Sequence, residues 1–144
     1  MPNDEIYTPK YVFDALRLIF DLDVCAPKGG SLHTPAVEYF DKDSDGLTAR
    51  WFGTVWMNPP YSNPRPWIDK FIAHGNGVAL VPFAKSQWFI DLWNSPAVGL
   101  PLPVSLKFIT EKSQKHSIWM PTSLWAMGEP SVSALKQSGL ANVR

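Results

Sequence analysis

The chain has 144 residues, of which 45% are hydrophobic and 18% charged, and its formal net charge is zero. This composition is typical of one globular domain and excludes a disordered chain, and no apolar run reaches the roughly 18 residues of a membrane span. The single cysteine, Cys25, excludes an internal disulfide and fits a reducing cytoplasm, and the acidic, polar N-terminus does not resemble a signal peptide.

Charge is unevenly distributed along the chain. Residues 1–57 carry 5 Lys/Arg and 9 Asp/Glu, whereas residues 58–144 carry 8 and 4. The second part is therefore basic, which favours contact with a polyanion such as nucleic acid.

The first half of the chain predicts one helix followed by short strands. Thr8 and Pro9 predict the cap and the first residue of that helix. Its predicted apolar face consists of Val12, Leu16, Ile19 and Phe20. Strands are predicted at 22–26, 37–40 and 53–60, with an acidic run at 41–46 and one helical turn at 47–51.

The second half predicts two helices around a strongly apolar strand. Residues 65–75 predict a helix that begins at prolines and ends at Gly75, and residues 77–83 predict a strand buried on both faces. Residues 86–93 predict a helix with Trp88, Phe89, Leu92 and Trp93 facing inward. Later segments give no pattern at 94–117, a hairpin or two edge strands at 117–128, a short helix at 131–139 and a flexible tail at 139–144.

This alternation predicts an α/β, three-layer domain over residues 1–144, with a mostly parallel sheet and a C-terminal hairpin. Ligands in such sheets bind beyond the carboxyl ends of the strands. Ala26, the acidic run and Asn58 all follow predicted strands. We therefore expect the functional site at this edge of the sheet.

The strand at 53–60 ends in the motif Asn58-Pro59-Pro60-Tyr61. The prolines fix the backbone, so that the Asn58 side chain and the Pro59 carbonyl can accept hydrogen bonds from one exocyclic amine. Two such acceptors favour the form of the amine whose lone pair is localised for attack. The ring of Tyr61 would hold a planar substrate. The motif therefore predicts methyl transfer to the amine of a base taken out of its duplex.

Four stretches together resemble the small phage Dam-like N6-adenine DNA methyltransferases. They are "YTPKYVFDAL", "LDVCA", "DSDGL" and "VWMNPPYS", in that order. The resemblance implies a reduced Rossmann-like methyltransferase fold, S-adenosylmethionine as cofactor, double-stranded DNA as partner, and a catalytic loop of Asn58, Pro59, Pro60 and Tyr61. It also implies a phage or prophage protein in the bacterial cytoplasm. The residues implied around the cofactor are Tyr7, Thr8, Pro9, Asp23, Ala26, Asp45 and Leu47.

The chain also departs from that family. The glycine-rich loop after the first strand is replaced by "APKGG", and one strand–helix unit is expected to be lost or shrunken. No separate target-recognition domain is expected. We therefore expect DNA to be contacted by the loop at 101–117. Its predicted phosphate contacts are Lys107, Lys112 and Lys115, with His116 beside them.

Several alternatives remain open at this point. The same tetrapeptide serves methyl transfer to cytosine N4 in DNA, to RNA bases and to glutamine side chains of proteins. A non-catalytic remnant that only binds nucleic acid is another reading. The three histidines lack the spacing of metal ligands, so no metal is expected, and the oligomeric state is not predicted.

Overall fold

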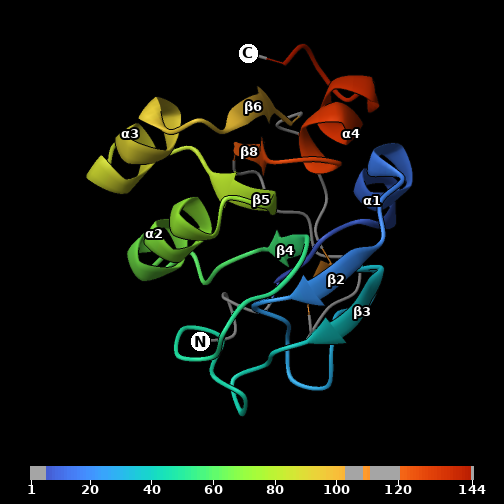
Figure 1. The fold of residues 1–144 in the computed structure, drawn as a ribbon, viewed down its shortest axis with the longest axis vertical. Helices are drawn as coiled ribbons and strands as arrows, with labels where there is room; N and C mark the ends of the chain where they lie inside the picture. The colour runs from blue at the N-terminus through green and yellow to red at the C-terminus, as the bar shows by residue number, and fades with distance from the viewer. Residues whose placement is uncertain (1–5, 103–108, 111–120, 144) are drawn as a thin grey trace.

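The computed structural model describes residues 6–102, 109–110 and 121–143 (Figure 1). Its centre is a sheet of six strands in the order β3-β2-β4-β5-β8-β6. Strands β2 (Phe20–Asp23), β3 (Ala36–Tyr39), β4 (Val55–Met57) and β5 (Gly77–Pro82) pair in parallel. Strand β8 (Thr122–Met127) pairs antiparallel with β5 and with β6 (Val98–Pro101), so that β6 again runs with the parallel set.

Helices cover both faces of the sheet (Figure 1). Helices α1 (Lys10–Leu16) and α4 (Ser131–Gln137) pack over one face, around Phe20, Trp56 and Leu124. Helices α2 (Arg65–His74) and α3 (Gln87–Asn94) pack over the other face, around Met57, Phe71 and Trp125. The α/β class with helices on both sides of a mostly parallel sheet is confirmed. Among the described residues no helix is long and apolar enough to cross a membrane.

Helix α2 and strand β5 lie where the sequence predicts them. Gly75 ends α2 in the left-handed conformation, with φ 70°, and its N–H donates to the Phe71 carbonyl. The first five residues of β5 are buried, as expected for a strand covered on both faces. The β4–α2–β5 unit therefore follows directly from sequence signals.

The predicted first helix is too long. Helix α1 ends at Leu16 because Arg17 adopts a left-handed conformation, φ 55°, and donates to the Phe13 carbonyl. Phe20 instead begins β2, and Ile19 is 76% exposed. Pro9, and not Thr8, occupies the cap position, and it makes no side-chain cap bond.

Other predicted elements also need correction. The sequence predicts a hairpin or two edge strands at 117–128. The second of these strands is present as β8, but it lies between β5 and β6 and not at an edge. Residues 117–120 lie outside the described part, so the predicted hairpin stays a prediction. The unassigned stretch 94–117 contains β6 and the short β7 (Ile109–Thr110), which pairs with β1 (Ile6–Tyr7). The predicted helical turn at 47–51 is a hydrogen-bonded turn, with Ala49 N–H donating to the Asp45 carbonyl. Trp93, predicted to face inward, is 58% exposed.

Candidate functional site at the carboxyl edge of the sheet

A cavity of about 310 Å³ lies where β2, β3 and β4 end. This volume is at the lower end of the range for small-molecule sites. We call it the edge cavity. Its lining includes the predicted site residues Thr8, Asp23, Ala26, Asp45, Asn58 and Pro60. Sequences 50 residues apart thus contribute to one hollow, as the rule for parallel sheets predicts.

Asn58 follows the last residue of β4 and is half-buried at the wall of the edge cavity. Its Nδ2 donates to Thr8 Oγ1 at 3.5 Å, and Thr8 is 5% exposed. The Pro60 carbonyl accepts from Asn63 N–H at 3.2 Å, which closes a turn directly after the motif. The motif is therefore held between a buried strand, a tight turn and Thr8, which lies two residues before α1.

Tyr61, like Pro59, is not among the residues that line the edge cavity, whereas Asn58 and Pro60 are. The Tyr61 hydroxyl is buried, and it has no hydrogen-bond partner in the described part of the chain. Burial raises the pKa of this hydroxyl. A buried donor without a partner destabilises the protein by about 1–3 kcal/mol, so the ring is held by packing and not by its polar end.

Replacing Tyr61 with phenylalanine should therefore stabilise the free protein by about 1 kcal/mol, because the unpaired hydroxyl disappears and the ring remains. The midpoint of urea denaturation measures this. Tyr39→Phe removes an exposed hydroxyl and is the matched control, for which no gain is expected. A loss of stability in Tyr61→Phe would show that the hydroxyl has a partner in solution.

Asp23, the last residue of β2, is the most buried charged group at the site. It is 2% exposed, and its carboxylate accepts from Ser31 Oγ at 2.7 Å and from Cys25 N–H at 3.2 Å. Burial raises the pKa of Asp23 to about 6, against the lowering effect of these two donors. The segment that replaces a glycine-rich loop thus folds back on the carboxylate. Ser31 was not predicted; its place in "APKGGS" is the only sequence signal for it.

The pKa of Asp23 predicts a pH dependence of stability. The folded pKa, about 6, lies above 3.8, the ordinary value of an aspartate in an unfolded chain. The stabilising contribution of protonated Asp23 is therefore fully present below 3.8 and is lost as pH rises through 6. Between these limits the parent should lose about 3 kcal/mol relative to Asp23→Asn. Denaturation of both proteins at pH 4, 5 and 7 measures the difference. The exposed Asp43→Asn is the control, whose curve should stay parallel to that of the parent; a parallel Asp23→Asn curve would contradict the prediction.

The acidic loop is organised by its own carboxylates. Asp41 accepts from Asp43 N–H, Ser44 Oγ and Gly29 N–H, and the backbone bond to Gly29 is the main cause of its lowered pKa. Asp45 has φ 51° and its Oδ1 accepts from Leu47 N–H at 3.2 Å. Asp45 lines the edge cavity, as does Asp41, which was not predicted as a site residue.

Lys70 of α2 holds the end of the acidic loop through its backbone carbonyls. Its Nζ donates to the carbonyls of Gly46, Leu47 and Ala49, at 3.2, 2.8 and 2.5 Å. It also lies 5.2 Å from the centre of the Trp51 ring. No sequence signal identifies this role, because the partners are backbone atoms more than 20 residues away.

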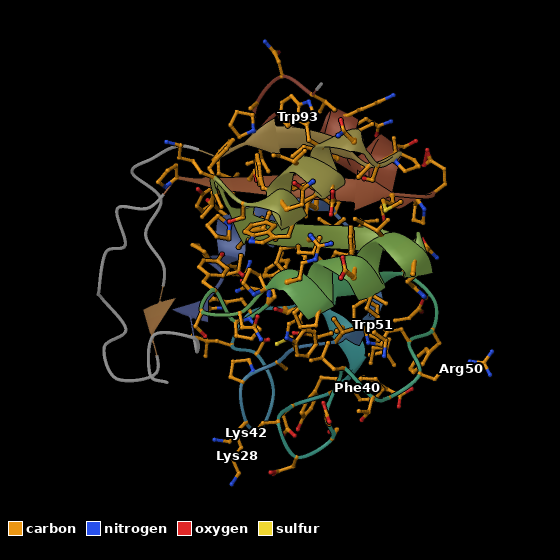
Figure 2. The ribbon with its side chains drawn as sticks, turned by 90° about the vertical axis from the view of Figure 1, so that its left-hand side faces the viewer. Lys28, Phe40, Lys42, Arg50, Trp51 and Trp93 are labelled. Carbon is orange, nitrogen blue, oxygen red and sulfur yellow. The ribbon has the colours of Figure 1, made fainter. Side chains whose placement is uncertain are left out.

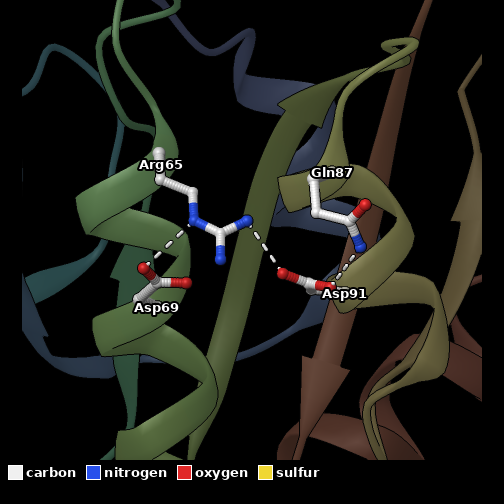
Figure 3. A network of polar contacts seen from close by, with 4 residues as sticks. All are labelled: Arg65, Asp69, Gln87 and Asp91. Atoms are coloured by element: carbon white, nitrogen blue, oxygen red, sulfur yellow. Dashed lines mark hydrogen bonds and ion pairs between the residues drawn. The ribbon is translucent and has the colours of Figure 1, made fainter.

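The loop that carries the Asn58–Tyr61 motif is anchored through the helix that follows it. Arg65, the first residue of α2, contacts Asp69 at 3.2 Å and Asp91 of α3 at 2.8 Å (Figure 3). Gln87 donates to the same Asp91 at 2.9 Å. These contacts join α2 to α3 immediately after the motif.

Some predicted site residues are not brought to the cavity. Pro9 and Leu47 do not line it. Tyr7 pairs through its backbone with Ile109, and its side chain is outside the described part. Lys107, Lys112, Lys115 and His116 lie outside the described residues, so their contact with DNA stays a prediction. Within the described ranges no cluster of three His, Cys, Asp or Glu side chains is placed to hold a metal.

Comparison with known protein families shows to which family the chain belongs. The family model for DNA N-6-adenine-methyltransferase (Dam) matches residues 2–117. The chain belongs to this Dam family. The match covers the edge cavity, the motif and every predicted site residue from Tyr7 to Lys115.

One curated relative of this Dam family chain is the DNA N-6-adenine-methyltransferase of Haemophilus phage HP1. It is 38% identical over 71 residues, which cover 46% of this chain and 39% of the phage protein. The chain thus aligns with well under half of that relative. No solved structure matches the chain significantly.

Proposed function

We propose that this protein is an S-adenosylmethionine-dependent methyltransferase that modifies the N6 amine of adenine in double-stranded DNA, on a reduced Rossmann-like fold. The observation that carries the proposal is the position of Asn58. It stands at the carboxyl end of β4, on the wall of a cavity that also contains the buried Asp23, in a chain of the Dam family.

The edge cavity fits S-adenosylmethionine in charge. The cofactor carries a sulfonium and an ammonium, and Asp23, Asp41 and Asp45 all line the cavity. A cation beside Asp23 favours the ionised carboxylate, which burial otherwise opposes. Lys28 and Lys42 line the outer part, where Figure 2 shows both side chains extending outward, and they are suited to the cofactor carboxylate. When bound, the cofactor supplies an electrophilic methyl group.

Asn58 acts on the adenine amine in this proposal. The neutral amine needs no base before attack, but its lone pair is delocalised into the ring. The Asn58 Oδ1 and the Pro59 carbonyl accept its two hydrogens and favour the localised lone pair. A bound cofactor would supply the methyl group to this lone pair, its sulfur would leave as a neutral thioether, and one amine proton would pass to water. Thr8, which accepts from Asn58 Nδ2, orients the amide so that its oxygen faces the amine.

Tyr61 holds the extruded base by stacking in this proposal. Because the ring lies outside the cavity lining with its hydroxyl buried and unpaired, base capture requires the ring to turn toward the cavity. Release of the unpaired hydroxyl to water offsets part of the cost of that movement. Phosphate contacts by Lys107, Lys112 and Lys115 complete the proposed DNA site.

We also propose that residues 1–144 act as a single domain in the cytoplasm of a bacterial host, where phage and host DNA are found. The name of the phage HP1 relative supports DNA as the substrate class and adenine N6 as the acceptor. It does not favour the readings in which cytosine, RNA or a protein glutamine is methylated.

Methyl transfer from labelled S-adenosylmethionine to unmethylated DNA, transfer RNA and protein in parallel tests the function. We expect label only in DNA, and N6-methyladenine in its nucleoside digest by mass spectrometry. N4-methylcytosine without N6-methyladenine would overturn the base assignment. Failure to bind either S-adenosylmethionine or S-adenosylhomocysteine at millimolar concentration, measured by calorimetry, would overturn the whole proposal.

A further inference from the structure

A second cavity, of about 690 Å³, lies at the other end of the sheet, and nothing in the proposed reaction uses it. We call it the aromatic groove. Its lining includes Phe83, Trp93, Pro101, Ser123, Trp125 and Asn142. Figure 2 shows Trp93 at the opposite end of the molecule from Lys28 and Lys42 of the edge cavity.

Two aromatic rings of the groove are exposed and yet firmly supported. Phe83 is 41% exposed and Trp93 is 58% exposed. Phe89 packs behind both, with ring centres 5.4 Å from Phe83 and 6.4 Å from Trp93. Trp125 supports Trp93 edge-on at 5.6 Å. Phe83 and Trp93 therefore form an apolar surface that is held in place by the rings behind it and is open to solvent.

The groove begins next to the proposed catalytic loop. Phe83 directly follows β5, and β5 pairs in parallel with β4, whose last residue, Met57, directly precedes Asn58. Met57 pairs with Ala79, so Phe83 lies four residues beyond that level, on the strand beside the motif and at the same carboxyl edge of the sheet. In the strand order of the sheet, the edge cavity with Asn58 lies at β3, β2 and β4, and the aromatic groove lies at β5, β8 and β6.

The charge beside the groove is positive. From residue 77 to residue 102 the charged side chains are Lys85 and Asp91. Asp91 is paired with Arg65 at 2.8 Å, whereas Lys85 is exposed and has no ion pair among the described residues. An aromatic ring and an unpaired cation two residues apart, on one loop, match the base and the phosphate of a nucleotide.

We propose that the aromatic groove binds an unstacked base of the DNA strand that flanks the target adenine, with Phe83 and Trp93 stacking on the base and Lys85 contacting its phosphate. This rests on the proposed function only in naming DNA as the substrate. The positive charge favours DNA over a second copy of this chain, whose net charge is zero.

Variants of the full chain test the groove. Phe83→Ala and Trp93→Ala should each weaken binding of a fluorescein-labelled, mixed-sequence DNA duplex about 10-fold by anisotropy. Each should raise KM for DNA by a similar factor and leave the affinity for S-adenosylmethionine unchanged. Trp93→Phe should retain most of the binding. Lys85→Ala should reduce the salt slope of binding by about one. Ile90→Ala is the control, since Ile90 is 50% exposed on the same helix but does not line the groove.

The outcomes separate this inference from the proposed function. Parent-like DNA affinity in folded Phe83→Ala and Trp93→Ala would overturn the groove assignment while methylation by the parent still stands. Loss of self-association in ultracentrifugation, with DNA affinity intact, would overturn it in favour of an interface between copies. If the parent protein methylates no DNA, the anisotropy measurements on the parent and the variants still decide whether the aromatic groove binds DNA.

Discussion

Replacing Asn58 with alanine should slow methyl transfer by about 100-fold or more and leave binding of S-adenosylmethionine intact. The expected loss is that of one preorganised acceptor at the reacting group, by analogy with the removal of one oxyanion-hole donor. Cofactor affinity should survive because the amide is proposed to face the base, while Asp23 and the acidic loop are proposed to face the cofactor. Single-turnover methylation and calorimetry measure the two quantities separately.

Asn63→Ala is the matched control for this experiment. Asn63 is an exposed amide of the same loop that does not line the edge cavity, and its backbone N–H, which donates to the Pro60 carbonyl, is kept in alanine. It should therefore leave the rate unchanged. An Asn58→Ala protein with undiminished activity would contradict the proposed mechanism. An Asn58→Ala protein that no longer binds the cofactor would show that Asn58 contacts the cofactor and not the base.

Gly46→Ala should destabilise the protein by about 3 kcal/mol, at the upper end of the range for overpacking. A Cβ on Gly46 would lie 2.1 Å from the Val24 carbonyl oxygen and 3.0 Å from the Trp67 ring. The carbonyl belongs to the backbone just after β2, so neither side can give way without moving the wall of the edge cavity. The Gly46 carbonyl also accepts from Trp51 Nε1 at 2.7 Å and from Lys70, and these bonds would be strained.

The midpoint of urea denaturation measures the loss, and calorimetry with S-adenosylmethionine should show weaker binding as well. Gly139→Ala is the control, since its new Cβ meets nothing within 4 Å. At φ 73° it should cost only the left-handed strain of a non-glycine residue, about 1 kcal/mol. Equal losses in the two variants would show that the approach of Gly46 to β2 is not close in solution.

The sequence predicts best those parts of the fold that depend on local signals. The limits of α2 follow from its prolines and Gly75, and β5 follows from an apolar run. Strand β6 was missed because Val98–Pro101 contains a glycine and a proline and does not alternate; it is held by its pairing with β8. Trp93 was misplaced because a helical pattern shows which residues share a face but not where the covering layer ends.

In the candidate site, too, some residues could be predicted from the sequence and others could not. The position of Asn58 at a strand end, and of Asp23 at another, could be predicted because parallel strands end at one edge. That Pro9 and Leu47 would not line the cavity could not be predicted, because it depends on side-chain direction within turns. The roles of Ser31 and Lys70 depend on contacts with the Asp23 carboxylate and with distant backbone carbonyls, which leave no pattern in the sequence.

Residues 24–35 and 40–54, all of them described, connect three neighbouring strands without a helix. The connections in this half of the molecule are therefore held by turns, by carboxylates and by Lys70. In the other half, helices α2 and α3 cover the sheet. Segments with few buried contacts open more often than packed strands, so backbone amides here should exchange with solvent long before those of β4, β5 and β8. A ligand bound among these loops would stabilise them most. Its binding should therefore slow amide hydrogen exchange mainly in this half of the chain.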